Sequence, residues 1–247
     1  MITLFLNSEQ IRALLQLINI TATNSDDFRD LATEGKILIK YNYYLTGPIG
    51  VGKSTTANLL RSLHVLDEWL EAKPAVLAKP WDELTPEELS KADDWIAHQF
   101  RHKNDALRRA PVGISVIDRP PLDPLAFAEI KERSVKAKKL LDKICPNRGW
   151  SVEPGVVILL TWEPEVLSAR VRGTGREKYS KEKLERMQRD ICEVYEGNGV
   201  HVIDTKFRPI LEVMKEVAEI IHRQEYKPFD LMAKFKSYEE SRDASNQ

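Results

Sequence analysis

A glycine-rich loop contains the residue types and spacing that bind phosphate. Residues 47–54 read Gly-Pro-Ile-Gly-Val-Gly-Lys-Ser, which matches the pattern GxxxxGK[ST]. Backbone N–H groups of such a loop curl around phosphate oxygens, and the N-terminus of the following helix adds partial positive charge. Lys53 would neutralise the β- and γ-phosphates of ATP, and Ser54 would offer its hydroxyl to Mg²⁺. The expected nucleotide-binding residues are Gly47, Pro48, Ile49, Gly50, Val51, Gly52, Lys53, Ser54 and Thr55.

A charged pair, Asp118 and Arg119, ends the strand-like run Ile-Ser-Val-Ile-Asp. In open α/β folds, ligands bind at the carboxyl ends of the strands, so both side chains would face a bound nucleotide. Asp118 would hold Mg²⁺ through water. Arg119 would contact the transferred phosphate with its guanidinium fork. The alternative is an ordinary salt bridge at a strand end.

A basic segment at residues 170–189 carries eight basic side chains against three acidic ones. Gly173 and Gly175 allow it to hinge, so its arginines could close over a triphosphate, supply charge in the transition state and exclude water. Exclusion of water favours transfer to an acceptor over hydrolysis. The alternative is a solvated basic helix face. We expect a lid over about residues 170–183 that acts through Arg170, Arg172 and Arg176.

Strand-like and helical segments alternate along the chain and would position these residues. The strand-like segments are 36–46, 64–69, 114–118, 156–161 and 200–204, and the helical segments are 55–63, 86–109, 125–144, 164–172, 181–195 and 210–222. Short Val, Ile and Leu runs separated by helices predict a three-layer α/β fold with a five-stranded parallel sheet. We expect a helical N-terminal extension over 1–40, a main domain over 41–224, and a polar tail over 225–247 with its last ten residues frayed.

The composition is that of an ordinary soluble chain. It has 247 residues, of which 42% are hydrophobic and 30% charged, and a formal net charge of -1. This balance gives no global argument for nucleic acid or membrane binding. Cys145 and Cys192 form no disulfide framework, and the N-terminal residues lack the features of a secretory signal. We therefore expect a cytoplasmic protein with a small-molecule acceptor, compatible with a homodimer.

These motifs together resemble the thymidylate kinase and deoxynucleoside kinase branch of the P-loop nucleoside and nucleotide kinases, over about residues 41–222. The matching segments are the loop at 47–55, Asp118-Arg119 with Ala126-Phe127 after it, residues 164–170 before the lid, and the last strand at 202–205. Members of this branch have a five-stranded parallel sheet. They transfer the γ-phosphoryl group of ATP to a nucleoside or its monophosphate, so the resemblance implies this fold and this reaction.

The sequence departs from both patterns of that branch at the acceptor side. Thymidylate kinases carry Arg-Glu-Pro-Gly-Gly-Thr after the second strand, whereas residues 67–74 here read Asp-Glu-Trp-Leu-Glu-Ala-Lys-Pro. Deoxynucleoside kinases place a catalytic Glu after the same strand, so the resemblance makes Glu68, or alternatively Asp67, the base for the acceptor hydroxyl. They also carry Glu-Arg-Ser where this chain has Asp-Arg-Pro at 118–120. The acceptor stays open between a nucleoside and a monophosphate.

The helical segment at 93–109 occupies the place where these families hold the acceptor base. Gln99, Arg101 and His102 would supply hydrogen bonds, and Trp95 or Phe100 a stacking surface, with core packing as the alternative for both aromatic residues. Asp123 precedes Pro124 and is typical of a helix N-cap. Two other functions stay open: a kinase for another small molecule or a polynucleotide 5′-hydroxyl, and a regulatory or defence module that uses ATP as a switch.

Overall fold

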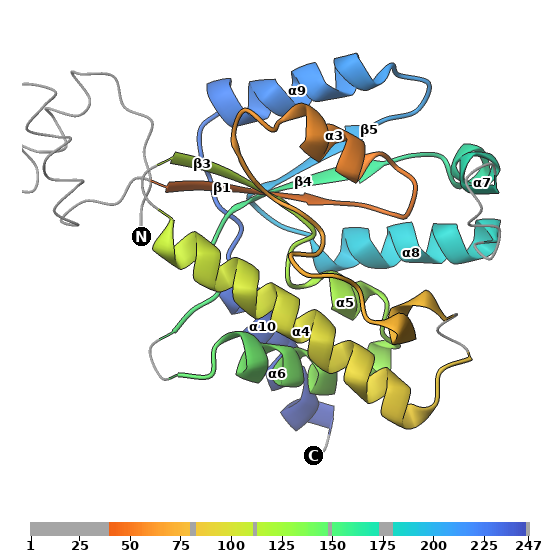
Figure 1. The fold of residues 1–247 in the computed structure, drawn as a ribbon, viewed down its shortest axis with the longest axis vertical. Helices are drawn as coiled ribbons and strands as arrows, with labels where there is room; N and C mark the ends of the chain where they lie inside the picture. The colour runs from red at the N-terminus through yellow and green to blue at the C-terminus, as the bar shows by residue number, and fades with distance from the viewer. Residues whose placement is uncertain (1–39, 80–82, 111–112, 148–149, 173–179, 246–247) are drawn as a thin grey trace, which may run out of the picture.

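Five parallel strands form the centre of the molecule (Figure 1). The structure is a computed structural model and describes residues 40–79, 83–110, 113–147, 150–172 and 180–245. The strands are β1 (Lys40–Thr46), β2 (His64–Leu66), β3 (Gly113–Asp118), β4 (Val156–Thr161) and β5 (Val200–Asp204). They lie in the order β2-β3-β1-β4-β5, and every neighbouring pair is parallel.

Helices cover both faces of this sheet (Figure 1). They are α3 (Lys53–Leu59), α4 (Pro86–Arg109), α5 (Asp123–Ala126), α6 (Arg133–Ile144), α7 (Pro164–Arg172), α8 (Lys181–Val194), α9 (Ile210–Arg223) and α10 (Leu231–Ser245), with 3₁₀ turns at Ala75–Ala78 and Ile130–Glu132. Helices α3 and α9 lie on one face, and α4, α6, α8 and α10 on the other. This is the three-layer α/β architecture that the sequence predicts.

The strands are apolar on both faces because each face packs into its own core. In β1, Tyr44 belongs to the core under α4 and α6, whereas Tyr43 and Leu45 belong to the core under α3 and α9. Residues that alternate along a strand point to opposite faces, so a continuous apolar run is required where both faces are covered. The buried runs of β1 and β4 follow from this requirement.

The long helix α4 begins at a complete capping box. The Thr85 side chain accepts a hydrogen bond from the Glu88 backbone N–H, the Glu88 side chain accepts one from Thr85 N–H, and Pro86 occupies the first turn. These contacts satisfy N–H groups that have no partner within the helix. The cap explains why the start of this helix is readable from sequence.

The C-terminal segment differs from its prediction as a polar, frayed tail. Helix α10 runs to Ser245, and Leu231 and Phe235 on it are fully buried against the core that contains α6. Just before it, Phe229 N–H donates to the Gly155 carbonyl oxygen at 2.9 Å. Over residues 231–240, where burial is described, only Leu231 and Phe235 are deeply buried, so the composition is polar although the inner face is core.

Three other predicted elements differ from the structure. The predicted helix over 55–63 is α3, which begins at Lys53 and ends at Leu59. The predicted helix over 125–144 is divided into α5 and α6 by the turn around 130–132, and β2 ends at Leu66, so residues 67–74 form a loop. The expected helices within residues 1–40 lie outside the described residues, apart from Lys40. Within the described part of the chain, no helix is both long and apolar enough to cross a membrane.

Candidate active site

The loop between β1 and α3 depends on glycine at two positions. A Cβ atom at Gly47, where φ is 139°, would lie 2.2 Å from the Leu160 carbonyl oxygen on β4. Gly52, at φ 110°, holds the N-cap position of α3 in a conformation that L side chains rarely adopt. The loop therefore lies tightly against the sheet edge, with the N-terminus of α3 open above it.

Lys53 is folded back onto the loop and buried. Its Nζ donates to the carbonyl oxygens of Gly47 at 2.8 Å and Pro48 at 3.0 Å, and only 6% of the residue is exposed. Burial, together with the nearby charge of Arg119, lowers the pKa of Lys53 to about 8. The Lys53 amine therefore lies against the loop, where it could bind a phosphate held by the loop.

Ser54 and Asp118 form a pair of oxygen ligands beside the loop. Ser54 Oγ donates to Asp118 Oδ2 at 2.9 Å, which joins the start of α3 to the end of β3. The other carboxylate oxygen, Asp118 Oδ1, is buried and has no hydrogen-bond partner among the described residues. Oxygen ligands of this kind suit Mg²⁺, and a buried oxygen without a partner is costly unless an ion or water satisfies it. The two residues thus fit a magnesium ion.

Arg119 lies at the junction of three elements in a rare backbone conformation. Its φ is 68°, and its N–H donates to the Leu45 carbonyl oxygen at 3.0 Å. Its Nε donates to Glu68 Oε1 at 2.6 Å and its Nη1 to Asp123 Oδ2 at 3.2 Å. Burial alone would disfavour its charge, but the surrounding carboxylates outweigh burial and raise the pKa of Arg119. The strained backbone and the two ion pairs together hold the guanidinium at the sheet edge.

Asp123 is a buried partner of Arg119 and not the N-cap that its position before Pro124 predicts. Leu122 holds the N-cap position of α5 and makes no side-chain cap. Asp123 Oδ1 accepts hydrogen bonds from Thr46 Oγ1 at 2.7 Å and Tyr195 Oη at 2.9 Å. Burial raises the pKa of Asp123, and Arg119 opposes this. Its carboxylate therefore ties β1, α8 and Arg119 together.

Lys103 on α4 completes the charged cluster. Its Nζ donates to the Asp118 carbonyl oxygen at 2.6 Å, and burial lowers its pKa to about 8 although Asp118 opposes the shift. When all groups are ionised, the cluster holds three positive and three negative charges. These belong to Lys53, Lys103 and Arg119, and to Glu68, Asp118 and Asp123. Sequence reasoning missed Lys103, whose only signal is its position one helical turn after Gln99.

The site's loop and strand ends lie within a segment that a known family model describes. A family described as an AAA domain matches residues 42–209, which is more than half of the chain. The chain belongs to this AAA domain family. No curated protein matches this AAA domain protein in sequence.

Two kinases are among the solved structures that this chain is similar to. Thymidylate kinase from Candida albicans is 16% identical, with a TM-score of 0.54, and the match covers 77% of this chain and 98% of that one. Deoxyadenosine kinase from M. mycoides with bound dATP is 14% identical, with a TM-score of 0.56, over 73% of this chain and 98% of that one. The same enzyme with the products dCMP and dCDP bound is 15% identical, with a TM-score of 0.56, over 74% of this chain and 100% of that one. At these identities the likeness shows the fold alone, which this chain shares with both kinases.

Glu68, and not Asp67, faces the charged cluster of the AAA domain protein. Glu68 pairs with Arg119, whose charge and hydrogen bond outweigh burial and lower the pKa of Glu68. Asp67 instead forms an exposed ion pair with Arg61. Of the two alternatives that the sequence leaves open, the structure brings only Glu68 to the cluster.

The α4 residues predicted to bind an acceptor have different surroundings. Gln99 is fully buried, and its Oε1 accepts from the backbone N–H groups of Leu70 at 2.9 Å and Glu71 at 3.2 Å, so it anchors the loop after β2. Arg101 lies apart from the cluster on α4, with its Nε 3.9 Å from Asp105. Phe100 is buried in the core, so it packs as a core residue and does not offer a stacking surface.

The side chains of the arginines expected in the lid are not described by the structure. The side chains of Arg170 and Arg172 and the whole of Arg176 lie outside what the structure describes. The lid over 170–183 stays a prediction from sequence. So does the role of its arginines in charge stabilisation.

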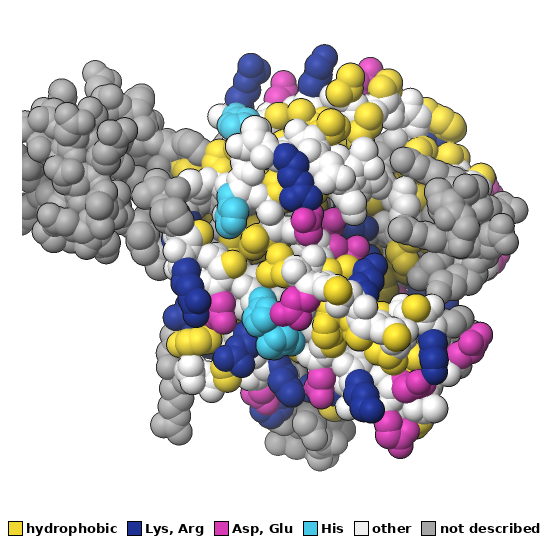
Figure 2. Space-filling model, in the orientation of Figure 1, with side chains coloured by type: hydrophobic (Ala, Val, Ile, Leu, Met, Phe, Trp, Pro, Cys, Tyr) yellow, Lys and Arg dark blue, Asp and Glu magenta, His cyan; other side chains and the backbone are white. Residues whose placement is uncertain are grey.

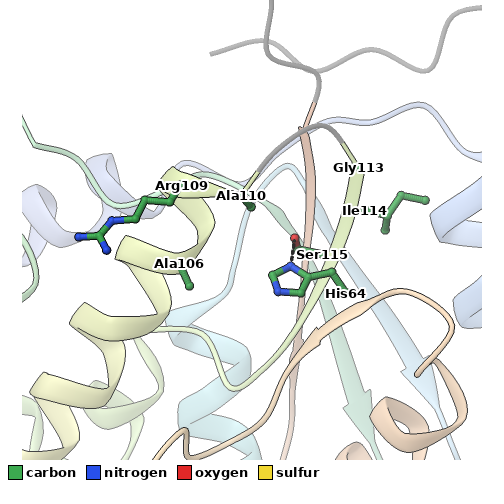
Figure 3. A pocket seen from close by; sticks show the side chains of 7 residues that line it. All are labelled: His64, Ala106, Arg109, Ala110, Gly113, Ile114 and Ser115. Carbon is green, nitrogen blue, oxygen red and sulfur yellow. Dashed lines mark hydrogen bonds between the residues drawn. The ribbon is translucent and has the colours of Figure 1, made fainter. Parts of the chain in front are cut away.

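Among the described residues, the larger of two cavities lies away from the charged cluster. A cavity of about 360 Å³ is lined by His64, Ala106, Arg109 and the start of β3, which is the sheet edge opposite the loop (Figure 3). A space of about 10 Å³ lies beside the cluster, lined by Phe100, Lys103 and Arg119 among others. The charged edge of the sheet, which is where ligands bind in open α/β folds, holds little free volume as it stands.

Proposed function

We propose that this protein is a kinase that transfers the γ-phosphoryl group of ATP to a nucleoside or a nucleoside monophosphate. The observation that carries this proposal is the meeting of two half-sites at one sheet edge. A phosphate loop with a Ser54–Asp118 ligand pair lies on one side, and an Arg119–Glu68 pair lies on the other. The first suits a nucleoside triphosphate and the second a hydroxyl or phosphate acceptor.

On the nucleotide side, the loop N–H groups would hold the phosphates while Lys53 changes partners. Its Nζ would leave the Gly47 and Pro48 carbonyl oxygens for phosphate oxygens. The anionic phosphates would then raise the pKa of Lys53 back toward its ordinary value, because an opposite charge favours the protonated amine. Mg²⁺, held by Ser54 and Asp118, would neutralise charge on the phosphate oxygens. Most of the catalysis would come from positioning and electrostatics.

An adenine base would find an aromatic surface after β5. Phe207 is 74% exposed, adopts a left-handed φ of 52°, and lies in the loop between β5 and α9. The start of α9 lies next to the phosphate loop, since a Cβ atom at Gly52 would be 3.9 Å from Ile210. An exposed ring beside the phosphate site suits stacking of a planar base.

On the acceptor side, Arg119 and Glu68 would have different roles in the reaction. Glu68 is ionised at neutral pH because its pKa is lowered, so it can accept the acceptor hydroxyl proton as that oxygen bonds to the γ-phosphorus. The bond from the γ-phosphorus to the bridging oxygen breaks, and ADP leaves. Arg119 would contact the transferred group or an acceptor phosphate. Because Arg119 Nε donates to Glu68 Oε1, this pair would open to let both groups contact an acceptor.

The test is an acceptor screen read by mass spectrometry. The protein is incubated with Mg·ATP and, separately, nucleosides, nucleoside monophosphates, sugars and 5′-hydroxyl oligonucleotides, with a Lys53→Met variant as the matched control. A phosphorylated nucleoside or monophosphate that the variant does not produce supports the proposal. A product only from sugars or oligonucleotides would move the activity to another kinase class. Slow ATP turnover without any phosphorylated acceptor would favour a nucleotide-dependent switch.

A further inference from the structure

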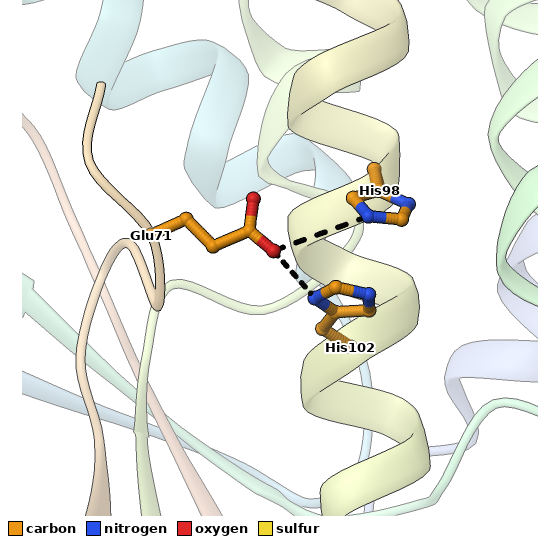
Figure 4. Close-up of side chains that lie close together, drawn as sticks. All are labelled: Glu71, His98 and His102. Atoms are coloured by element: carbon orange, nitrogen blue, oxygen red, sulfur yellow. Dashed lines mark ion pairs between the residues drawn. The ribbon is translucent and has the colours of Figure 1, made fainter. Parts of the chain in front are cut away.

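Two histidines on α4 and a glutamate from the loop after β2 point toward one another (Figure 4). Glu71 Oε1 lies 3.0 Å from His102 Nδ1 and 4.0 Å from His98 Nε2, and the two imidazole ring centres are 3.9 Å apart. One ligand atom from each residue lies within 4.8 Å of the others. In the space-filling view, histidine side chains gather beside acidic groups on the surface over α4 (Figure 2).

The geometry points to a binding site for a divalent transition metal, such as Zn²⁺, at Glu71, His98 and His102. His98 and His102 are four residues apart on a helix, which places both imidazoles on one face. Imidazole nitrogens with one carboxylate are a donor set that zinc and its neighbours accept, and three protein ligands leave a further position for water. We define these three residues as the His-Glu cluster.

The spacing of the ligand atoms is close to that of a bound ion. Ligands about 2 Å from a tetrahedral metal lie about 3.3 Å from one another. In the structure, Glu71 Oε1 is 3.0 Å from His102 Nδ1 and 4.0 Å from His98 Nε2, and the three ligand atoms all lie within 4.8 Å of one another. All three side chains are partly exposed, between 38% and 49%, so they can rotate by the small amount required.

The glutamate is oriented toward the histidines by a buried partner. Gln99 Nε2 donates to Glu71 Oε2 at 2.9 Å, which leaves Oε1 directed at the imidazoles. Gln99 is itself fully buried and also accepts the Glu71 backbone N–H. Partners of this kind fix the orientation of a metal-binding carboxylate. The His-Glu cluster is therefore a supported arrangement, and not three independent surface side chains.

The His-Glu cluster is separate from the magnesium ligands of the proposed active site. Ser54 and Asp118 offer oxygen only, which Mg²⁺ prefers, whereas the His-Glu cluster offers two nitrogens. A metal there would join the loop at residues 67–74, which carries Glu68, to α4, which carries Lys103. Binding would stabilise the folded state because the ligands come from two elements that separate on unfolding.

The test is calorimetric titration of the full chain with ZnCl₂ in excess Mg²⁺, so that the oxygen-ligand site is occupied. We expect one equivalent of Zn²⁺ to bind, His98→Ala and His102→Ala each to weaken binding by about 10-fold to 100-fold, and Glu71→Gln to weaken it less. His222→Ala, an exposed position on α9, is the matched control and should bind as the wild type does. Co²⁺ should show visible absorption that the double His98→Ala, His102→Ala variant lacks.

Circular dichroism of each variant shows whether it folds, and these exposed positions tolerate small side chains. His98→Gln and His102→Gln keep side-chain volume and serve as second variants if an alanine variant loses its helical signal. Absence of saturable Zn²⁺ binding overturns the proposal. Binding that the double variant leaves unchanged overturns it as well.

Discussion

Replacing Lys53 by Met is expected to remove activity while leaving stability nearly unchanged. Burial, with the charge of Arg119, lowers the pKa of this amine from 10.5 to about 8. At about 1.4 kcal/mol for each pH unit, keeping the amine charged at neutral pH costs the folded state about 3 kcal/mol. Methionine removes that cost together with the two hydrogen bonds to loop carbonyls, each worth about 1.5 kcal/mol, the lower end for a charged donor. The free energy of unfolding should change by about 1 kcal/mol or less.

The pH dependence gives a sharper test of the same reasoning. Between about pH 8 and pH 10 the unfolded chain keeps a proton on Lys53 that the folded chain has lost, so stability should rise with pH. Lys103 contributes in the same window because its pKa is also lowered to about 8. The two lysines together should contribute about 2.4 kcal/mol per pH unit to the slope near pH 9, and Lys53→Met should remove about half of this contribution.

The measurement is urea unfolding by circular dichroism between pH 7 and pH 9.5, with product formation assayed in parallel. Lys215→Met, at an exposed position on α9, is the matched control and should change neither slope nor turnover. If Lys53→Met lowers the free energy of unfolding at pH 7 by about 3 kcal/mol, or leaves its slope against pH unchanged, then the charged amine does not destabilise the folded state and the reasoning is refuted. Turnover near that of the wild type would refute its role in phosphoryl transfer.

Three further changes test the rest of the charged cluster. Glu68→Gln should lower kcat by about 10²-fold to 10⁴-fold with little effect on the KM for ATP, since it removes the base; a kcat within a factor of ten of the wild type would contradict this. Asp118→Asn should raise the Mg²⁺ concentration needed for half-maximal rate by about tenfold, because a neutral amide oxygen binds Mg²⁺ more weakly than a carboxylate; an unchanged magnesium titration argues against the Ser54–Asp118 pair. Asp123→Asn should lower the free energy of unfolding by about 3 to 5 kcal/mol, because it breaks a buried ion pair. The control Asp142→Asn, which breaks an exposed pair, should lower it by about 1 kcal/mol or less. Equal effects of the two changes would count against a buried ion pair.

Much of the fold is readable from sequence because local signals agree with the tertiary structure. The strands at 156–161 and 200–204 and the helices at 86–109 and 164–172 have the predicted bounds. Apolar runs mark the strands, since both sheet faces are buried, and a capping box or a proline marks each of these helix starts.

The parts that sequence reasoning missed depend on contacts between distant residues. Asp123 has the local pattern of a helix cap, but Thr46 and Tyr195, 77 and 72 residues away, make it a buried partner of Arg119. Lys103 carries no motif and is drawn into the site only because α4 crosses the end of β3. Gln99 and Arg101 are two residues apart on a helix, about 200° around its axis, so they cannot share one pocket.

The late position of α10 in the chain has a consequence for synthesis. The core that Leu231 and Phe235 complete includes residues of α6 and α8, which leave the ribosome much earlier. Until α10 follows, that apolar surface stays open to water, and the nascent chain is exposed to aggregation and to capture by chaperones. The rate at which residues 225–245 are translated should therefore influence how much of the protein reaches its native state.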